Sequence, residues 1–298
     1  MNNASLGISL AALVPALLLC AFVYYKDKTE KEPLWLLAIL FACGAVVFFP
    51  ALLLEQTLGD VIDSAFADKM IFSFDGRLSY ASEGDRFAHL SIFTLMIAFV
   101  EESAKWLLLF FITRKNKNFN YLFDGIVYST FISMGFAAVE NVRFAVIDGW
   151  DTFFLRAVTS VPGHLFFGIF MGCCYTVWHT YSEAVSIEKD LQKKKSITER
   201  KFKCSALWLI LSLALPVAVH MVYSFTESYG TRAVTSFYYV FVIALYVLCF
   251  FNINRMSGKD ASNERIAYAW VLKKHLNIEK NITKLTEKLL REKEGSDE

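Results

Sequence analysis

The stretch FVEESAKWLLLF, residues 99–110, sets Glu101, Glu102 and Lys105 inside an apolar run long enough to cross a membrane. Near the centre of a bilayer each such charge costs about 2.5–3.5 kcal/mol on insertion scales. In a helix Lys105 lies one turn from both acids, so its ammonium can neutralise either carboxylate. A packing ion pair needs only one acid. The second carboxylate indicates a group that transfers protons, and an ion pair that merely fixes helix packing is the alternative.

The composition of the chain is that of a polytopic membrane protein. Hydrophobic residues make up 55% of its 298 residues, and the mean hydropathy is +0.41, which is too apolar for a soluble protein of this length. The net charge of +1 argues against a nucleic-acid-binding surface. Apolar runs of roughly 20 residues or more predict an all-α bundle of about seven transmembrane helices, at about 5 to 25, 34 to 54, 89 to 113, 121 to 147, 153 to 181, 204 to 226 and 233 to 253.

The loops between these runs predict the orientation of the chain. Basic residues are dense in the first, third and fifth loops and sparse in the others, which by the positive-inside rule places the N-terminus outside and the C-terminus in the cytoplasm. The second loop contains IFSFDGRLSY, residues 71–80, where Asp75-Gly76 between alternating residues predicts a small extracytoplasmic β-hairpin.

The composition changes after residue 253. We therefore expect a transmembrane domain over residues 1–253 and a charged cytoplasmic tail over residues 254–298. The tail is predicted to form an amphipathic helix or coiled-coil arm, and we assign it no chemistry. Its apolar residues at helical spacing are Ile278, Ile282, Leu285 and Leu289.

Three more polar residues inside the predicted spans lie at a depth similar to that of the paired acids. They are Glu140 in FAAVEN, His164 in VPGHLFFGIFMG and His220 in ALPVAVHMVYS. From the helical rise, the distances below the outer helix ends are about 18 Å for Glu101, 16 Å for His164, 10 Å for Glu140 and 9 Å for His220. Four helices that share one layer of the membrane indicate a common site. Taken singly, Arg143 could neutralise Glu140, and each histidine could be a hydrogen-bonded packing residue.

Small residues predict where the helices approach closely. Gly168 and Gly172 follow His164 at four-residue steps, so His164 should face protein. A second stripe of small residues comprises Gly125, Ser129, Ser133 and Ala137, and Asp124 beside it is expected to cap its helix or lie in the interface. The histidines expected to lie outside the site are His89, His179 and His275.

The ordered set of these residues resembles the PrsW family of intramembrane proteases, which is related to the CAAX-processing and Abi group of membrane proteases. Members carry a double glutamate followed by a lysine, then an FxxxE motif, then separate membrane histidines. The matching residues are Glu101, Glu102, Lys105, Phe136, Glu140, His164 and His220. The block FDGIVYSTFISMGFAAVEN, residues 123–141, is similar to the family's most recognisable segment, and the resemblance covers roughly residues 34–253.

Some positions depart from the CAAX-type pattern, which more often has EExxxR, FxxxH and a histidine followed four residues later by Asn or Asp. Lys105 stands at a shorter spacing and Glu140 replaces the histidine, and both differences favour the PrsW branch over prenyl-protein processing. Ser224 follows His220, which weakens the case for an oxyanion-stabilising side chain there.

The resemblance implies an endopeptidase of the bacterial cell membrane that cleaves a membrane-anchored protein, such as an anti-sigma factor, near its extracytoplasmic side in a signalling or maturation pathway. In a metal version Glu140, His164 and His220 would hold Zn²⁺, and Glu101 or Glu102 would act as the base. In a metal-free version one of these two glutamates activates water directly and a histidine stabilises the oxyanion. Both versions stay open, as do the choice of base and the oligomeric state.

Two other classes of protein would also use intramembrane charges. A proton-coupled transporter needs a relay of ionisable residues that continues toward the cytoplasm, and a receptor or scaffold needs only packing pairs. Here the ionisable residues gather on one side of the predicted bundle and no inverted repeat is evident. The pattern therefore favours the peptidase.

Overall fold

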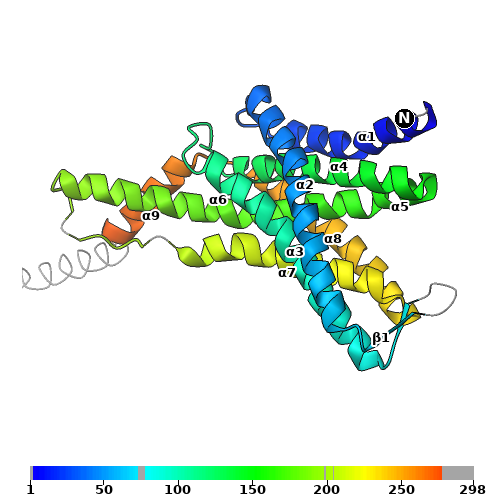
Figure 1. Ribbon diagram of the computed structural model, residues 1–298. Coiled ribbons are helices and arrows are strands. Elements are labelled where there is room, and N and C mark those ends of the chain that lie inside the picture. The colour runs from blue at the N-terminus through cyan, green and yellow to red at the C-terminus, as the bar shows by residue number, and fades with distance from the viewer. Residues whose placement is uncertain (1–2, 73–77, 198, 204, 277–298) are drawn as a thin grey trace, which may run out of the picture.

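The computed structural model describes residues 3–72, 78–197, 199–203 and 205–276. These residues form long helices and one short hairpin (Figure 1). In chain order the elements are α1 (Asn3–Lys26), α2 (Leu34–Ala65), β1 (Met70–Phe72), β2 (Leu78–Tyr80), α3 (Glu83–Thr113), α4 (Asp124–Asp148), α5 (Trp150–Val158), α6 (Ser160–Lys193), α7 (Ala206–Tyr229), α8 (Arg232–Gly258) and α9 (Asn263–Leu276).

The prediction of an all-α membrane bundle with about seven spans is confirmed. Within the described part of the chain, six helical segments are long and apolar enough to cross a membrane: α1, α2, α4, α5 together with α6, α7 and α8. The charged helix α3, 31 residues long, lies among them. The run at 153 to 181, expected as one helix, is instead divided between α5 and the 34-residue α6. A further break at Gly149, whose φ of +87° favours glycine, ends α4 before α5 begins.

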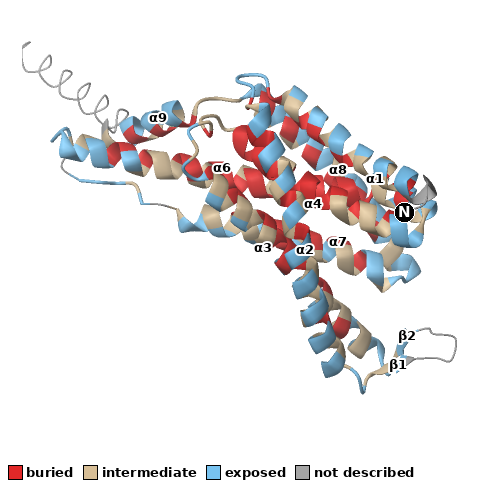
Figure 2. Cartoon of the chain, turned by 45° about the horizontal axis from the view of Figure 1, so that its top comes forward, coloured by how far each residue is buried: buried red, intermediate tan, exposed pale blue. Residues whose placement is uncertain are grey.

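Helix α4 lies at the centre of the bundle, where it packs against α1, α2 and α6. Figure 2 shows the buried residues concentrated in this central region. The predicted small-residue faces meet here: a Cβ placed on Gly172 would lie 2.3 Å from the Gly125 carbonyl oxygen, and one on Gly168 would lie 2.8 Å from Ser133 Oγ. Larger side chains at these positions would force α4 and α6 apart, so the glycines permit the close approach that brings His164 beside α4.

The ends of α2 and α3 that flank the hairpin project from the bundle (Figure 1). β1 and β2 pair antiparallel, with Met70 opposite Tyr80. The predicted hairpin is therefore present as a β element, and its predicted turn at Asp75-Gly76 lies outside the described residues. His89 on α3 connects the hairpin to the projecting end of α2. Its Nδ1 lies 2.8 Å from the Tyr80 hydroxyl on β2, and its Nε2 lies 2.9 Å from Asp63 Oδ1 on α2.

The predicted domain boundary at residue 253 falls within a helix, because α8 continues to Gly258. Helix α9 then packs against α6, with Ala267 and Val271 buried against Ala184 and Ile187. The amphipathic pattern predicted from Ile278 to Leu289 lies outside the described residues. The division at residue 253 stays a prediction, although the packing of α9 shows that part of the predicted tail is joined to the bundle.

Buried acids gather where the loop between α1 and α2 meets the start of α4. Glu32, which is 3% exposed, accepts a hydrogen bond from the Tyr128 hydroxyl at 2.5 Å. Asp124 is fully buried, and its Oδ2 accepts hydrogen bonds from the backbone of Asn120 and Tyr121, so it caps the preceding loop. Burial is the main reason that the pKa of Glu32 rises to about 7, and nearby Asp27 and Glu30 raise it further.

We expect the thermal stability of the protein in detergent to fall between pH 5 and pH 7.5, in part because of Glu32. Its pKa is about 7 in the folded state against an ordinary value of 4.5, so the folded protein holds a proton that the unfolded chain has already released. The contribution of Glu32 to stability is therefore greatest at low pH and declines as the pH rises toward 7, by on the order of 1–3 kcal/mol. Glu32→Gln should flatten this decline, whereas Glu83→Gln, which removes a carboxylate that is 75% exposed and far along the chain, should not. An unchanged slope in Glu32→Gln would contradict the assignment.

Candidate active site

Lys105 organises a group of charged and polar side chains in the interior of the bundle. The residue is fully buried, and its Nζ donates to Glu101 Oε2 at 3.1 Å and to Glu102 Oε1 at 2.8 Å. The same Nζ lies 3.0 Å from His164 Nδ1 on α6. The predicted pairing along α3 is thus present. Since an ammonium has three N–H donors, these three acceptors use all of them, which leaves Lys105 no freedom to serve another group.

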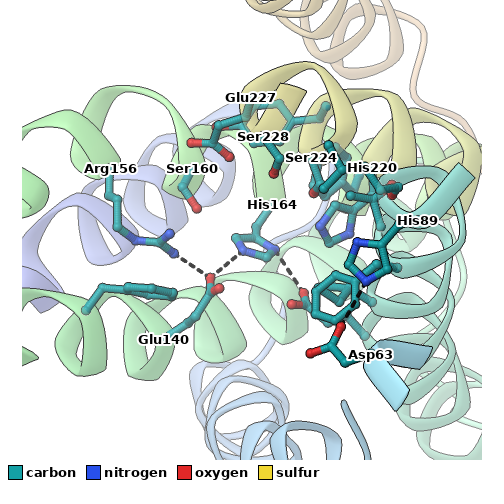
Figure 3. Close-up of a pocket in the computed structure, with 18 of the residues that line it drawn as sticks. Asp63, His89, Glu140, Arg156, Ser160, His164, His220, Ser224, Glu227 and Ser228 are labelled. Carbon is teal, nitrogen blue, oxygen red and sulfur yellow. Dashed lines mark hydrogen bonds and ion pairs between the residues drawn. The ribbon is translucent and has the colours of Figure 1, made fainter. Parts of the chain in front are cut away.

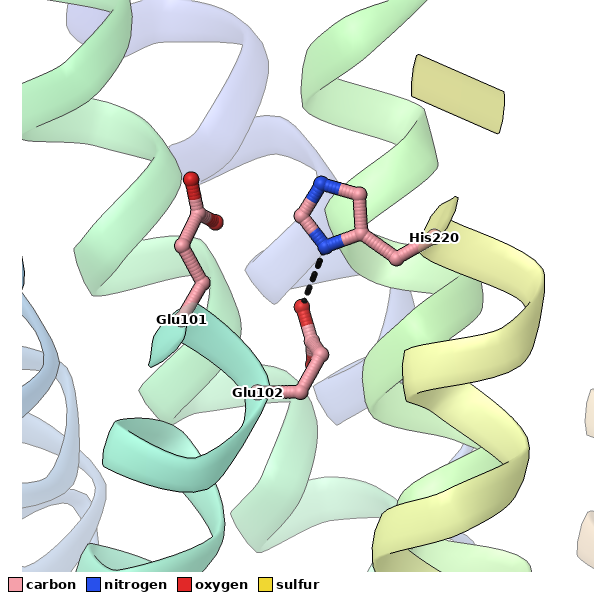
Figure 4. A group of neighbouring side chains, drawn as sticks. All are labelled: Glu101, Glu102 and His220. Carbon is pink, nitrogen blue, oxygen red and sulfur yellow. Dashed lines mark hydrogen bonds and ion pairs between the residues drawn. The ribbon is translucent and has the colours of Figure 1, made fainter. Parts of the chain in front are cut away.

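His220 joins the group from α7 (Figure 4). Its Nδ1 lies 3.0 Å from Glu102 Oε1, and its ring stacks on Phe167 with centroids 4.4 Å apart. Glu101, Glu102 and His220 each present one ligand atom within 4.8 Å of the other two. Glu102 Oε2 is buried and has no hydrogen-bond partner among the described residues. An unpaired carboxylate oxygen beside a second carboxylate and an imidazole is suited to bind a cation.

Glu140 enters from α4 on the other side of His164 (Figure 3). Its Oε2 lies 2.8 Å from His164 Nε2 and 2.7 Å from Arg156 Nη2. Arg143, the neighbour expected from the sequence, lies instead over the Phe144 ring, with its guanidinium carbon 5.1 Å from the centroid. The ion pair of Glu140 therefore reaches across the helix break to α5 rather than along α4.

The contacts of His164 define the proton arrangement of its ring. Because Nε2 faces the Glu140 carboxylate, it carries the proton and donates; Nδ1 then accepts from Lys105. This tautomer is inferred from the hydrogen-bond network. Both ring nitrogens of His164 are thus occupied within the protein. Glu140 and His164 would have to leave these contacts to act as metal ligands with His220, so the predicted ligand set remains a prediction, and Glu101, Glu102 and His220 offer a second set.

A cavity of about 520 Å³ connects the hairpin region with this group (Figure 3). Its lining includes Tyr80 on the hairpin strand β2 and His89 near the start of α3. From the bundle it includes Glu101, His164 and His220. His89, predicted to lie outside the site, shares the cavity but is hydrogen-bonded to the hairpin and α2. Glu101 lines the cavity, whereas Glu102 is 0% exposed. A substrate and a water molecule arriving through the cavity would therefore meet Glu101 first.

The other two excluded histidines lie elsewhere. His179 is buried and stacks on Phe119 with centroids 4.1 Å apart. His275 Nε2 lies 2.6 Å from Glu188 Oε1, which fastens α9 to α6. Their contacts give both of them structural roles at the opposite end of α6 from His164.

Sequence reasoning missed three ionisable residues around the site. Arg156 lies in the predicted span 153 to 181 but belongs to no motif, and the structure places it on the short helix α5. Glu55 has a buried Oε1 without a hydrogen-bond partner and interacts electrostatically with Glu101 and Glu140. It follows directly after the predicted end of the second span, so the sequence pattern places it in a loop. Glu227 lines the cavity two helical turns after His220, and that seven-residue spacing could have revealed it.

The fold and the site together define a polytopic membrane protein with a buried group of Glu, Lys and His residues at the inner end of a cavity. The PrsW-protease model, described as the PrsW family intramembrane metalloprotease, matches residues 32–250, and the chain belongs to this family. It is therefore an intramembrane peptidase by family.

Similar proteins carry the same family name. The chain is 29% identical to Protease PrsW of Oceanobacillus iheyensis over 260 residues, which cover 87% of this chain and 100% of the relative. It is 28% identical to Protease PrsW of Halalkalibacterium halodurans and 26% identical to that of Bacillus subtilis, each time over 72% of this chain and 80% of the relative. No solved structure matches the chain.

Proposed function

We propose that this protein is an endopeptidase of the bacterial cell membrane that cuts a single-span, membrane-anchored protein near its extracytoplasmic side, with an anti-sigma factor as one candidate substrate. The observation that carries the proposal is the cavity, which extends from the predicted extracytoplasmic hairpin to Glu101, His164 and His220. A substrate segment unwound at the outer membrane surface could reach the buried carboxylates by this path. The proposal keeps the N-terminus outside and the C-terminus in the cytoplasm.

The chemistry assigns a role to each side chain. Glu101, at the cavity wall, would accept the proton of the attacking water. Lys105 holds Glu101 and Glu102 together through two buried ion pairs. His164, whose two ring nitrogens are held by Glu140 and Lys105, would keep the Lys105 ammonium and the two glutamates in position beside the cavity. His220 lines the cavity together with Glu101 and is oriented by the contact of its Nδ1 with Glu102 Oε1, so it would relay the proton taken up by Glu101 to the leaving amine.

The family description names a metalloprotease, and the chain offers donors that fit a divalent ion. Glu101, Glu102 and His220 would hold it, since their ligand atoms converge and Glu102 Oε2 is unpaired. Two carboxylates and an imidazole are ligands that zinc accepts, and zinc bound there would acidify a coordinated water.

The proposal is tested with the purified full-length protein in liposomes that contain a panel of single-span membrane proteins, including an anti-sigma factor. We expect cleavage of at least one of them, with the cut mapped by mass spectrometry to the outer half of the substrate's span. Treatment with a chelator followed by zinc addition reports on the metal: loss and recovery support it, and full activity in chelator supports the metal-free version. Proton flux across the vesicles without any cleavage would instead favour the transporter.

A further inference from the structure

Arg156 belongs to none of the motifs that identify the family resemblance, yet it contacts the site directly. We infer that Arg156 is a positioning residue of the peptidase: it fixes the Glu140 carboxylate so that Glu140 in turn fixes the orientation and tautomer of His164. The inference rests on the proposed function, because it assigns a kinetic consequence to this contact. It adds to the site a residue from α5, a helix that the sequence pattern did not connect with chemistry.

The geometry makes Glu140 the link between the two residues. A single oxygen, Glu140 Oε2, lies 2.7 Å from Arg156 Nη2 and 2.8 Å from His164 Nε2. The Arg156 and Glu140 side chains are each only 14% exposed. Little solvent screens this ion pair, which acts through charge rather than through an aligned hydrogen bond, because Arg156 Nη2 has no hydrogen-bond partner among the described residues. Moving the guanidinium would therefore move or release the oxygen that holds the histidine.

Arg156 is itself held in place. Its guanidinium carbon lies 4.0 Å from the centroid of Phe144, one turn beyond Glu140 on α4. The cation–π interaction stabilises the guanidinium in its position over the Phe144 ring. The C-terminal end of α5 is anchored by Tyr246, whose hydroxyl donates to the Val158 carbonyl oxygen at 2.7 Å. Arg156 is thus supported by α4 on one side and by α8 on the other.

The charges around His164 explain why the contact between Arg156 and Glu140 affects the imidazole ring. Among the described residues, the charged groups that face His164 directly are Lys105, Glu140 and, at 3.9 Å, Glu101. Arg156 acts on the ring through Glu140. Glu55 and Glu227 are further acids in the same region, and both interact electrostatically with Glu140. Without Arg156, the Glu140 carboxylate would lose the cation that holds it and could turn away from the His164 ring. His164 would then lose the carboxylate that accepts its Nε2 proton. The proton could move to Nδ1, and Nδ1 could then no longer accept the hydrogen bond from Lys105.

The test compares Arg156→Met, Arg156→Lys and the control Arg143→Met in the liposome cleavage assay. For Arg156→Met we expect kcat to fall about 10–100-fold, the range typical of residues that orient a ligand or catalytic group, with KM for the substrate within about twofold. Arg156→Lys should recover most of the loss, because the observed pair uses one nitrogen and an ammonium can replace it. Arg143→Met should leave both constants unchanged.

Several outcomes would overturn the inference while the wild-type protein still cleaves. An increase in KM at constant kcat would make Arg156 a substrate contact, and an unchanged kcat would remove it from the site. Failure of Arg156→Lys to recover activity would point to a structural defect. Thermal unfolding checks the pair without substrate: Arg156→Met should lower the melting temperature in the wild-type background and have little effect in Glu140→Gln. Absence of wild-type cleavage refutes the proposed function, and equal destabilisation in both backgrounds refutes the pairing.

Discussion

Replacement of Glu101 by glutamine is expected to reduce cleavage about a thousandfold without unfolding the protein. Glutamine has the same shape but cannot accept the proton of an attacking water, and general base catalysis contributes roughly 10²–10⁴-fold. The loss should appear in kcat, because the carboxylate acts on the reacting water rather than on substrate binding. The measurement is the initial rate of cleavage in liposomes, normalised to folded protein. The same loss is expected if Glu101 holds a metal.

The fold should survive this change because Lys105 retains two acceptors, Glu102 Oε1 at 2.8 Å and His164 Nδ1 at 3.0 Å. Glu83→Gln is the matched control: it lies on the same helix, its side chain is 75% exposed, and its rate should match the wild type. Wild-type cleavage by Glu101→Gln would exclude Glu101 as base and as metal ligand. A fully active Glu101→Gln together with an inactive Glu102→Gln would transfer the base to Glu102.

The helices were predictable because the bilayer imposes a simple requirement on the chain. Each span needs an apolar run of roughly 20 residues, and that signal is present in composition alone. The ends of helices were harder to predict. α2 continues past residue 54 to Ala65, and α6 continues to Lys193, because both leave the apolar layer and are then stabilised by packing or by the hairpin. No bilayer signal marks such extensions.

The site was predictable to the extent that its residues are anomalous in a membrane. The paired acids, Glu140, His164 and His220 stood out as polar residues in apolar runs, and the structure brings them into contact. The choice of partner was not predictable. Arg143 is three residues from Glu140, whereas Arg156 is separated from it by a helix break, yet Arg156 makes the ion pair. Proximity along the chain does not determine which cation a buried acid meets when the chain folds back.

Replacement of Lys105 by methionine is expected to have the largest effect on stability. The residue is 0% exposed and is the shared partner of Glu101, Glu102 and His164. Methionine fills a similar volume but leaves two neighbouring carboxylates with no buried cation between them. Breaking a buried ion pair from one side typically costs about 3–5 kcal/mol. We expect a loss of this size in thermal or denaturant unfolding in detergent, together with loss of cleavage.

A surface lysine and a compensating change separate buried charge from other causes. Lys69→Met removes a cation whose side chain is 45% exposed and 3.6 Å from Asp85 Oδ1, and it should cost less than about 1 kcal/mol. Adding Glu102→Gln to Lys105→Met removes one of the two stranded charges, so the double variant should be more stable than Lys105→Met alone. If the second change destabilises further by its full single-variant amount, the two side chains do not interact, and Lys105 cannot be the residue that holds the carboxylates in place.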